Sequence, residues 1–263
     1  MPSIFKNKKI SFIIVSYKSK KFLTDCVNSI IKYTSGEYEI VIVDNNSGEN
    51  LDEIQNLSTS KIKIIYSQKN AGFGSGVNLG ATQATGDWLC IINPDTRIQG
   101  DIHTLSTIDK NTKLIGLALV NQENQIQAYQ YGDFPTPKSI ISKRAKKQWQ
   151  NPKQETISTD WISGGSICIE AKLFQELGGF DDRFFMYYED IDLCYRAKQA
   201  GYQAYWTQQI TIWHYEGGSE SKIINTKKRY YKSQRQYIAK YYGQIWAIIL
   251  YPLHLIQLCK FVQ

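Results

Sequence analysis

Apolar positions in the first third of the chain fall into short runs that alternate with segments of helical spacing. A short apolar run fits a buried strand, whereas apolar residues at every third or fourth position fit one face of a helix. This alternation predicts an α/β fold with a Rossmann-like, mainly parallel central sheet and helices on both faces. The expected strands are 10–15, 39–43, 62–66 and 88–92, and the expected helices are 22–31, 51–57 and 77–84.

Polar or acidic residues follow each of these expected strands. The strand-end segments are 16–17 (SY), 44–47 (DNNS), 70–74 (NAGFG) and 93–95 (NPD). Ligands of open α/β sheets bind beyond the carboxyl ends of the strands, so these segments are candidates for a binding site. Asp, Asn, Ser and Gly also form turns, which is the alternative for any single segment. Four such segments on one edge favour binding.

Acidic residues cluster at 189–192 (EDID), where the helical spacing of apolar residues resumes. Glu189 and Asp190 are expected in the first turn of this helix, where the helix dipole stabilises negative charge. Asp192 and Arg196 have the four-residue spacing of an ion pair on one helix face. Such a pair is structural, so Asp192 is not expected to take part in chemistry.

The segment 221–263 differs from the rest of the chain in pattern. A helix rich in Lys and Arg is expected over 224–243, and an apolar tail, 245–262, follows it. One proline and three polar residues interrupt the tail, and each is costly at bilayer depth. An interfacial segment anchored by Trp246 and Tyr251 is therefore favoured over a membrane span. Packing on the domain or an oligomer contact is the alternative.

Composition narrows the class of protein further. With 263 residues and 42% hydrophobic content, we expect one domain over 1–220 and a helical tail over 221–263. A net charge of +7 suits nucleic acid, anionic lipid or phosphorylated small molecules, and 13% aromatic residues argue against a disordered polycation. Five scattered cysteines without a Cys-x-x-Cys pair, and no apolar signal sequence, indicate reduced cytoplasm with neither zinc nor disulfides.

Seven segments recur in the order and spacing of one known family. They are IIVSYK at 13–18, VIVDNNS at 41–47, NAGFGSGVN at 70–78, INPDT at 92–96, WISGGS at 161–166, GGFDDRFFMYYEDIDLCYR at 178–196 and WHYEGGS at 213–219. Together they resemble the nucleotide-sugar glycosyltransferases of the GT-A fold, specifically the inverting family 2 and its rhamnosyltransferase-like members. The resemblance covers about residues 10–220, without 121–158, and not the tail.

The resemblance implies a site for a nucleotide diphosphate sugar. Asp44 would recognise the base, because a carboxylate can accept the N3–H of uracil or thymine; an Asx turn is its alternative role. Asn78 is expected at the start of the helix after the glycine segment, whose amides suit an anion. The full set of expected donor-binding residues is Val15, Ser16, Tyr17, Asp44, Asn70, Gly72, Phe73, Gly74, Asn78, Asn93, Asp95, Trp161, Gly164 and Gly165.

The resemblance also implies a metal ion and a general base. Asp95 stands in the family's acidic motif and is expected to bind Mg²⁺ or Mn²⁺, with His214 as a second ligand. Without the resemblance, a Pro-Asp turn and an ordinary polar histidine are the alternatives. Asp190 is expected to remove the proton of an attacking hydroxyl, with Glu189 orienting the acceptor or Asp190.

We therefore expect a metal-dependent inverting glycosyltransferase. Its donor would be a dTDP- or UDP-sugar, foremost dTDP-L-rhamnose. Its acceptor would be a lipid-linked glycan of a bacterial surface polysaccharide such as lipopolysaccharide, met in the cytoplasm at the inner face of the membrane.

Two other classes of protein are weighed against this expectation. A catalytically inactive sugar-binding protein would lack Asp190 or Asp95, and both are present. A dinucleotide-dependent oxidoreductase would place its glycine-rich loop after the first strand, and here it follows the third. Nucleic acid is not an expected partner, because only net charge and tyrosines between cations suggest it.

Overall fold

The computed structural model describes residues 3–58, 60–109, 111–142, 154–215 and 223–259. The first half contains β1 (Ile10–Ser16), α1 (Lys20–Tyr33), β2 (Tyr38–Asp44), α2 (Asp52–Gln55), β3 (Ile62–Tyr66), α3 (Phe73–Ala81), β4 (Trp88–Ile92), β5 (Thr96–Ile98), a 3-10 turn (Ile102–Thr104) and β6 (Leu114–Val120). The second half contains β7 (Tyr131–Gly132), α4 (Pro137–Ile141), β8 (Thr156–Thr159), β9 (Trp161–Ile162), β10 (Ser166–Glu170), α5 (Ala171–Glu176), α6 (Glu189–Gln199), β11 (Ala204–His214), α7 (Ile223–Tyr242) and α8 (Gln244–Cys259).

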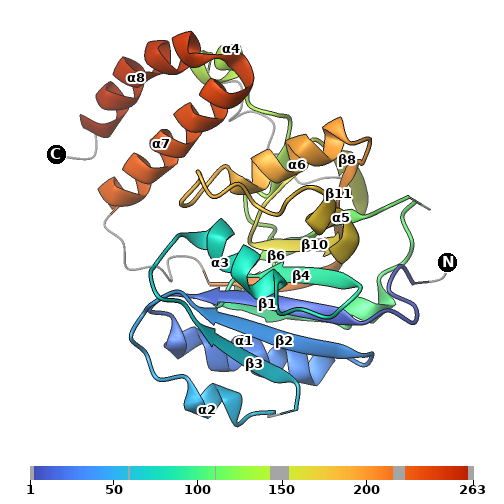
Figure 1. Cartoon of the computed structure of the whole chain (residues 1–263). Coiled ribbons are helices and arrows are strands. Elements are labelled where there is room, and N and C mark those ends of the chain that lie inside the picture. The colour runs from blue at the N-terminus through green and yellow to red at the C-terminus, as the bar shows by residue number, and fades with distance from the viewer. Residues whose placement is uncertain (1–2, 59, 110, 143–153, 216–222, 260–263) are drawn as a thin grey trace.

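The described residues form one large sheet with strand order β3-β2-β1-β4-β10-β6-β11-β5, and β8 pairs with β11 (Figure 1). The pairs β1–β2, β2–β3, β1–β4 and β6–β11 are parallel, whereas β10, β5 and β8 run antiparallel to their neighbours. The mainly parallel sheet predicted from the apolar runs is confirmed, together with all four of its predicted strands.

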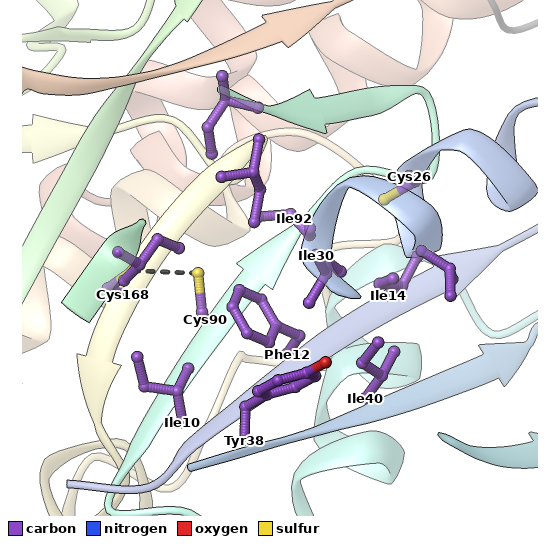
Figure 2. Close-up of a cluster of buried hydrophobic side chains, with 14 of the residues drawn as sticks. Ile10, Phe12, Ile14, Cys26, Ile30, Tyr38, Ile40, Cys90, Ile92 and Cys168 are labelled. Carbon is purple, nitrogen blue, oxygen red and sulfur yellow. Dashed lines mark hydrogen bonds between the residues drawn. The ribbon is translucent and has the colours of Figure 1, made fainter. Parts of the chain in front are cut away.

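Helices cover both faces of the sheet because the central strands are apolar on both sides. Along β1, Phe12 and Ile14 face one cluster, in which α1 and α2 pack. Ile13 and Val15 face a second cluster, in which α3, α5 and α6 pack. This follows from the two-residue period of a strand, which sends successive side chains to opposite faces. Figure 2 shows the first cluster, with Phe12 beside Ile30 of α1.

Helix α3 begins at Phe73, earlier than the predicted start at residue 77. Its first turns contain several glycines, and glycine disfavours a helix by about 1 kcal/mol relative to alanine. Close packing of α3 against β1 outweighs this local preference. A Cβ on Gly76 would lie 2.7 Å from the Val15 side chain, and one on Gly80 would lie 2.8 Å from Ile13. The glycines therefore let α3 lie directly against β1.

Helices α7 and α8 form a hairpin that turns at Gly243, whose φ of +96° favours glycine (Figure 1). A third apolar cluster joins this hairpin to the loop before α6 and to α6 itself, through residues such as Tyr188, Tyr237 and Leu250. Trp246 packs partly into this cluster. Among the described helices, none is long and apolar enough to cross a membrane. The predicted domain boundary at 220/221 lies outside the described residues.

Candidate active site

The predicted strand-end segments meet at one edge of the sheet. Ser16 at the end of β1 pairs with Asp44 at the end of β2. Strand β4 ends at the same level, and the antiparallel β10 begins beside it. Gly164 and Gly165 immediately precede β10, and the backbone N–H of Asn93 donates to the carbonyl of Gly165 at 3.3 Å. Segments far apart in sequence therefore line a common edge, as expected for an open α/β sheet.

Asp44 lies at this edge with only 3% of its surface exposed. Its carboxylate accepts hydrogen bonds from the hydroxyl of Ser47 at 2.5 Å and from the backbone N–H of Ser47 at 3.2 Å. The turn considered as its alternative role is therefore present. Val15 and Ser16 are buried beside it, whereas Tyr17 is 47% exposed. Recognition of a base by Asp44 stays a prediction, and it would require the carboxylate to exchange or share its Ser47 contacts.

Asn45 positions the glycine segment, a role that the sequence did not single out. Its side-chain amide donates to the carbonyl of Gly72 at 2.9 Å and to the side chain of Asn70 at 3.1 Å. Its side-chain oxygen accepts from the backbone N–H of Ala71 at 3.3 Å. Asn45 is buried, so these contacts hold 70–72 against the end of β2. The sequence places Asn45 and Asn46 side by side, and nothing in it indicates which of the two side chains points inward.

The glycine segment approaches protein backbone closely. Gly72 has a φ of +96°, and the backbone N–H of Phe73 donates to the carbonyl of Phe185 at 2.9 Å. A Cβ on Gly72 would overlap that same carbonyl oxygen. A Cβ on Gly74 would lie 2.9 Å from the Phe180 side chain. These glycines therefore admit the chain before α6, which carries the acidic pair.

Replacing Gly72 with Ala is expected to destabilise the protein more than the same change at Gly48. Both glycines have positive φ, but a Cβ on Gly48 meets nothing within 4 Å. The difference should be about 1–3 kcal/mol in the free energy of unfolding, the usual cost of overpacking. Urea denaturation of the two variants measures it. Equal losses would mean that the contact with Phe185 does not constrain this segment.

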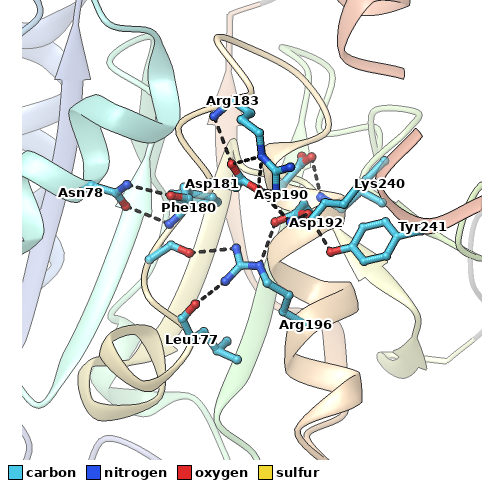
Figure 3. Close-up of polar contacts among 12 residues, drawn as sticks. Asn78, Leu177, Phe180, Asp181, Arg183, Asp190, Asp192, Arg196, Lys240 and Tyr241 are labelled. Carbon is cyan, nitrogen blue, oxygen red and sulfur yellow. Dashed lines mark hydrogen bonds and ion pairs between the residues drawn. The ribbon is translucent and has the colours of Figure 1, made fainter. Parts of the chain in front are cut away.

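The position predicted for Asn78 is wrong. It lies well inside α3 rather than at its start, because the helix begins at Phe73. Its side chain donates to the carbonyl of Phe180 and accepts from the backbone N–H of Phe180, both at 2.8 Å. It also donates to Asp182 at 3.1 Å. Asn78 therefore fixes the chain after Gly179, and its amide is already occupied by protein (Figure 3).

Asp190 lies in the first turn of α6, as predicted, and its two carboxylate oxygens are held by backbone N–H groups. Gly164 donates to Oδ2 and Ile191 to Oδ1, each at 2.8 Å. Burial raises the pKa of Asp190, and these two N–H donors oppose the rise. A Cβ on Gly164 would lie 3.2 Å from the Phe73 ring and 3.6 Å from Asp190. Phe73, Gly164 and Asp190 therefore lie close together.

Glu189 is buried beside Asp190, and its Oε2 atom has no hydrogen-bond partner among the described residues. Burial, and then the negative charge of Asp190, raise the pKa of Glu189 well above its usual range. Asp190 has N–H donors on both oxygens, so the negative charge is better stabilised there. Burial therefore favours the neutral form of Glu189 more than that of Asp190. The negative charge of the pair is thus favoured on Asp190.

The turn that presents this pair is strained and is held by α7. Tyr187 and Tyr188 both have a φ of +70°, a region that residues with a side chain rarely adopt. Ser233 donates to the carbonyl of Met186 at 2.8 Å, and Gln234 donates to the hydroxyl of Tyr188 at 2.5 Å. Helix α7 therefore stabilises the backbone that precedes Glu189.

Asp192 forms the centre of a buried charge network between α6 and α7 (Figure 3). It is 0% exposed, and it accepts from Arg196 at 2.8 Å, as the four-residue spacing predicted. Lys240 at 2.5 Å and Tyr241 at 2.7 Å, both on α7, also donate to it. Arg196 in turn donates to the carbonyl of Gly179 at 2.8 Å. The sequence indicated the pair within α6 but not the partners from α7.

Asp95 and His214, the two predicted metal ligands, lie on neighbouring chain segments. His214 pairs with Thr96 across β11 and β5, and its Nε2 is 3.5 Å from Oδ1 of Asp95. Gln127 donates to the carbonyl of His214 at 3.0 Å, and its side-chain oxygen lies 2.7 Å from Nδ1. That oxygen can only accept, so Nδ1 donates to it and Nε2 is the ring nitrogen that faces Asp95. Two metal-binding atoms therefore converge.

Trp161 is fixed on β9 at the side of this edge. Its indole N–H donates to the carbonyl of Asp133 at 3.0 Å, and its ring packs partly into two apolar clusters. Contact of this ring with a sugar stays a prediction. A Cβ on Gly165 would lie 3.0 Å from the Leu119 side chain and 3.4 Å from the side-chain amide of Asn93. Gly165 thus allows Asn93 to approach the start of β10.

The family to which the chain belongs is shown by the match to a family model. The model described as glycosyl transferase family 2 matches residues 11–160, more than half of the chain. The chain belongs to glycosyltransferase family 2. Members of this family invert the configuration of the transferred sugar, and the matched region includes the strand-end segments of β1, β2, β3 and β4.

Several curated relatives of this glycosyltransferase are named as hexosyltransferases or rhamnosyltransferases. The low-salt glycan biosynthesis hexosyltransferase Agl10 of Haloferax volcanii is 27% identical over 239 residues, covering 88% of this chain and 75% of its own. The rhamnosyltransferase WbbL of Escherichia coli K12 is 24% identical over 251 residues, covering 88% and 93%. The N-acetylglucosaminyl-diphospho-decaprenol L-rhamnosyltransferase of Mycobacterium tuberculosis is 20% identical over 238 residues, covering 80% and 77%.

Solved structures confirm that the fold is GT-A. GalNAc-T7 with UDP, GalNAc and Mn²⁺ aligns with a TM-score of 0.65 at 20% identity, covering 88% of this chain and 47% of its own. The mannosyltransferase PcManGT of Pyrobaculum calidifontis, in complex with GDP-Man and Mn²⁺, aligns with a TM-score of 0.62 at 14% identity, covering 89% and 64%. The chain thus spans about half to two thirds of these two structures.

Proposed function

We propose that this glycosyltransferase transfers L-rhamnose from dTDP-L-rhamnose to a lipid-linked glycan, at the cytoplasmic face of the membrane, in the assembly of a bacterial surface polysaccharide. The observation that carries the proposal is the half-buried Asp190 carboxylate, fixed by the N–H groups of Gly164 and Ile191. The choice of rhamnose is supported by the sequence motifs and by two relatives that are named as rhamnosyltransferases. The diphospholipid in the name of one of them supports the class of acceptor.

Asp190 is the general base in this proposal. A hydroxyl attacks poorly until its proton is removed, and a positioned carboxylate contributes about 10²–10⁴-fold. The acceptor hydroxyl would attack the anomeric carbon from the face opposite the nucleotide, form the new C–O bond and give its proton to Asp190 as the bond to the diphosphate breaks. Because Gly164 and Ile191 already hold the carboxylate, no reorientation is needed at the moment of attack.

Glu189 acts as a neutral neighbour of the base. A protonated carboxyl can donate a hydrogen bond, and its Oε2 has no partner among the described residues. We propose that this atom orients the acceptor or the base. If Glu189 were ionised as well, its negative charge would repel that of Asp190. The raised pKa of Glu189 favours its neutral form, which removes this repulsion.

Asp95 and His214 would hold a divalent cation in this site. Their facing atoms are 3.5 Å apart, which suits two ligands of one ion at about 2.1 Å each. Among the residues that the structure describes, no group of three or more His, Cys, Asp and Glu side chains could hold a metal ion. Mg²⁺ and Mn²⁺ usually take one or two protein ligands plus substrate phosphates. Such an ion would neutralise the departing diphosphate. Two solved neighbours contain Mn²⁺.

We expect dTDP to raise the melting temperature of the protein more in the presence of Mn²⁺ than in its absence, because a ligand that binds the folded state stabilises it. UDP should act similarly if Asp44 recognises the N3–H that both bases share. Differential scanning fluorimetry with dTDP, UDP, GDP and NAD measures this. A shift with NAD alone, or no shift with any nucleotide, would contradict the proposed donor site.

His214→Ala provides the matched test of the cation site. The variant should lose most of the Mn²⁺-dependent part of the dTDP shift and keep the metal-independent part. His103→Ala is the control, because His103 lies away from this edge, beside Asp101. An undiminished Mn²⁺ effect in His214→Ala would remove His214 from the proposed ligands.

A further inference from the structure

Helix α8 has its polar side chains turned inward. His254 is 1% exposed, stacks on the Tyr231 ring with centroids 4.5 Å apart, and contacts Arg235 through Nδ1 at 3.1 Å. Gln257 accepts a hydrogen bond from the hydroxyl of Tyr231 at 2.5 Å. These contacts join α8 to α7. They also remove two of the three polar side chains of α8 from the outer surface.

The outer side of α8 is apolar. The helix Gln244–Cys259 contains no Asp, Glu, Lys or Arg. Ile245 is 74% exposed, Ile248 69% and Ile256 61%. Ile249, Leu253 and Leu255 are exposed as well. A helix on the surface of a soluble domain normally has the reverse arrangement, with its apolar stripe toward the core. A continuous apolar surface of this kind indicates contact with something other than water.

Positive charge accompanies this apolar surface. The hairpin 223–259 contains six of the 31 basic residues of the chain and none of its 24 acidic residues. The rest of the chain is therefore almost neutral. Lys228, Lys232 and Arg235 have the spacing of one helix face, and Arg235 lies over the Tyr251 ring of α8 at 4.9 Å. The shared face of these three cations thus borders α8.

We propose that the outer face of α8 docks on the surface of an anionic lipid bilayer. The helix would lie in the interface with its isoleucines among the acyl chains and the α7 cations at the lipid phosphates. A second copy of the chain is a poorer occupant, because it would bring a hairpin of the same positive charge to the contact. Figure 1 shows α8 on the side of α7 that faces away from the sheet, where a planar surface can reach it.

Docking would place the acidic pair close to the bilayer. Helix α7 contacts α8 on one side and holds Met186 and Tyr188 on the other. Packed helices lie about 8–10 Å apart, so one helix layer separates the docking face from the turn before Glu189. This position suits an acceptor carried on a lipid. The docking itself does not depend on the donor or on the chemistry proposed above.

Vesicle sedimentation of the full chain tests the docking. We expect the protein to sediment with vesicles of phosphatidylcholine and phosphatidylglycerol, and binding should weaken with added salt or without phosphatidylglycerol. Lys228→Gln with Lys232→Gln should weaken binding about 25-fold, since each lysine contributes about fivefold at an anionic surface. Ile248→Glu with Ile256→Glu should weaken it at least ~100-fold, through lost burial of two apolar side chains.

Lys6→Gln with Lys172→Gln is the control for both double variants. Both lysines are exposed and lie outside the hairpin, and this change lowers the net charge by the same amount. The control should bind vesicles as the unaltered protein does. All the changed side chains are exposed, so each variant is expected to fold normally. An unchanged melting temperature and an unchanged dTDP shift would show that it does.

Three results would overturn the proposal. They are no sedimentation of the unaltered protein with anionic vesicles, loss of binding in the control equal to that in the hairpin variants, and binding that is the same in all variants. Sedimentation velocity adds a fourth. The unaltered protein could be a dimer that is lost in the variant Ile248→Glu with Ile256→Glu, while vesicle binding stays the same. That result would assign the face to a second copy of the chain.

Discussion

Asp190→Asn is expected to lower the rate of sugar transfer by about 10²–10⁴-fold and to leave nucleotide binding unchanged. Asn has the shape of Asp and can still accept from Gly164 or Ile191, so the turn should stay folded. It cannot take up the proton of an attacking hydroxyl. Release of dTDP from dTDP-L-rhamnose measures the rate, and titration calorimetry with dTDP measures binding.

Glu189→Gln is the matched control for Asp190→Asn. Glutamine resembles a protonated glutamic acid, which is the state that burial and the charge of Asp190 favour at this position. The rate should therefore fall by less than about tenfold, far less than for Asp190→Asn. Near-normal transfer by Asp190→Asn, with a large loss in Glu189→Gln, would exchange the two roles and contradict our assignment of the base.

Asp192→Asn is expected to lower the free energy of unfolding by about 3–5 kcal/mol, the usual cost of breaking a buried ion pair. Asp192 is 0% exposed and offsets the charges of Arg196 and Lys240. Without it, two cations remain beside a neutral amide at the contact of α6 with α7. The same contact supports the strained turn at Tyr188, so sugar transfer should also fall. The midpoint of urea denaturation gives the change in stability.

Glu176→Gln tests whether burial is the cause of that loss. Glu176 and Lys172 have the same four-residue spacing as Asp192 and Arg196, but their ion pair is exposed on α5 and 3.9 Å long. Exposed pairs of this kind contribute about 0.2–0.5 kcal/mol. A loss in Asp192→Asn as small as that in Glu176→Gln would show that the network between α6 and α7 does not stabilise the fold.

The central strands could be predicted from sequence because they are buried on both faces and read as unbroken apolar runs. Strand β4, WLCII, is an example, and its predicted bounds agree with the structure. The start of α3 could not be predicted in the same way. Gly76 and Gly80 disfavour a helix locally, and only the proximity of β1 explains them. Packing between distant segments decided that boundary.

Some features of the candidate site could likewise be predicted from sequence, and others could not. The acidic pair could be placed at a helix start because helical spacing resumes just there. The support for that pair could not, because Ser233, Gln234 and Lys240 lie more than 40 residues away in sequence. The strained turn was hidden too, since Tyr188 gives no sequence signal for a φ of +70°. Long-range contacts impose that conformation, and they are absent from any local pattern.

The most direct test of Asp190 as the base of an inverting transfer is NMR of dTDP-L-rhamnose turnover, with water as the acceptor. Early spectra, taken before the free sugar mutarotates, report the anomer that is released first. We expect dTDP and free L-rhamnose of inverted anomeric configuration to form together, and the signals of both products to grow hardly at all with Asp190→Asn. First release of the anomer with the donor's own configuration, or an equal rate in Asp190→Asn, would contradict an inverting transfer with Asp190 as its base.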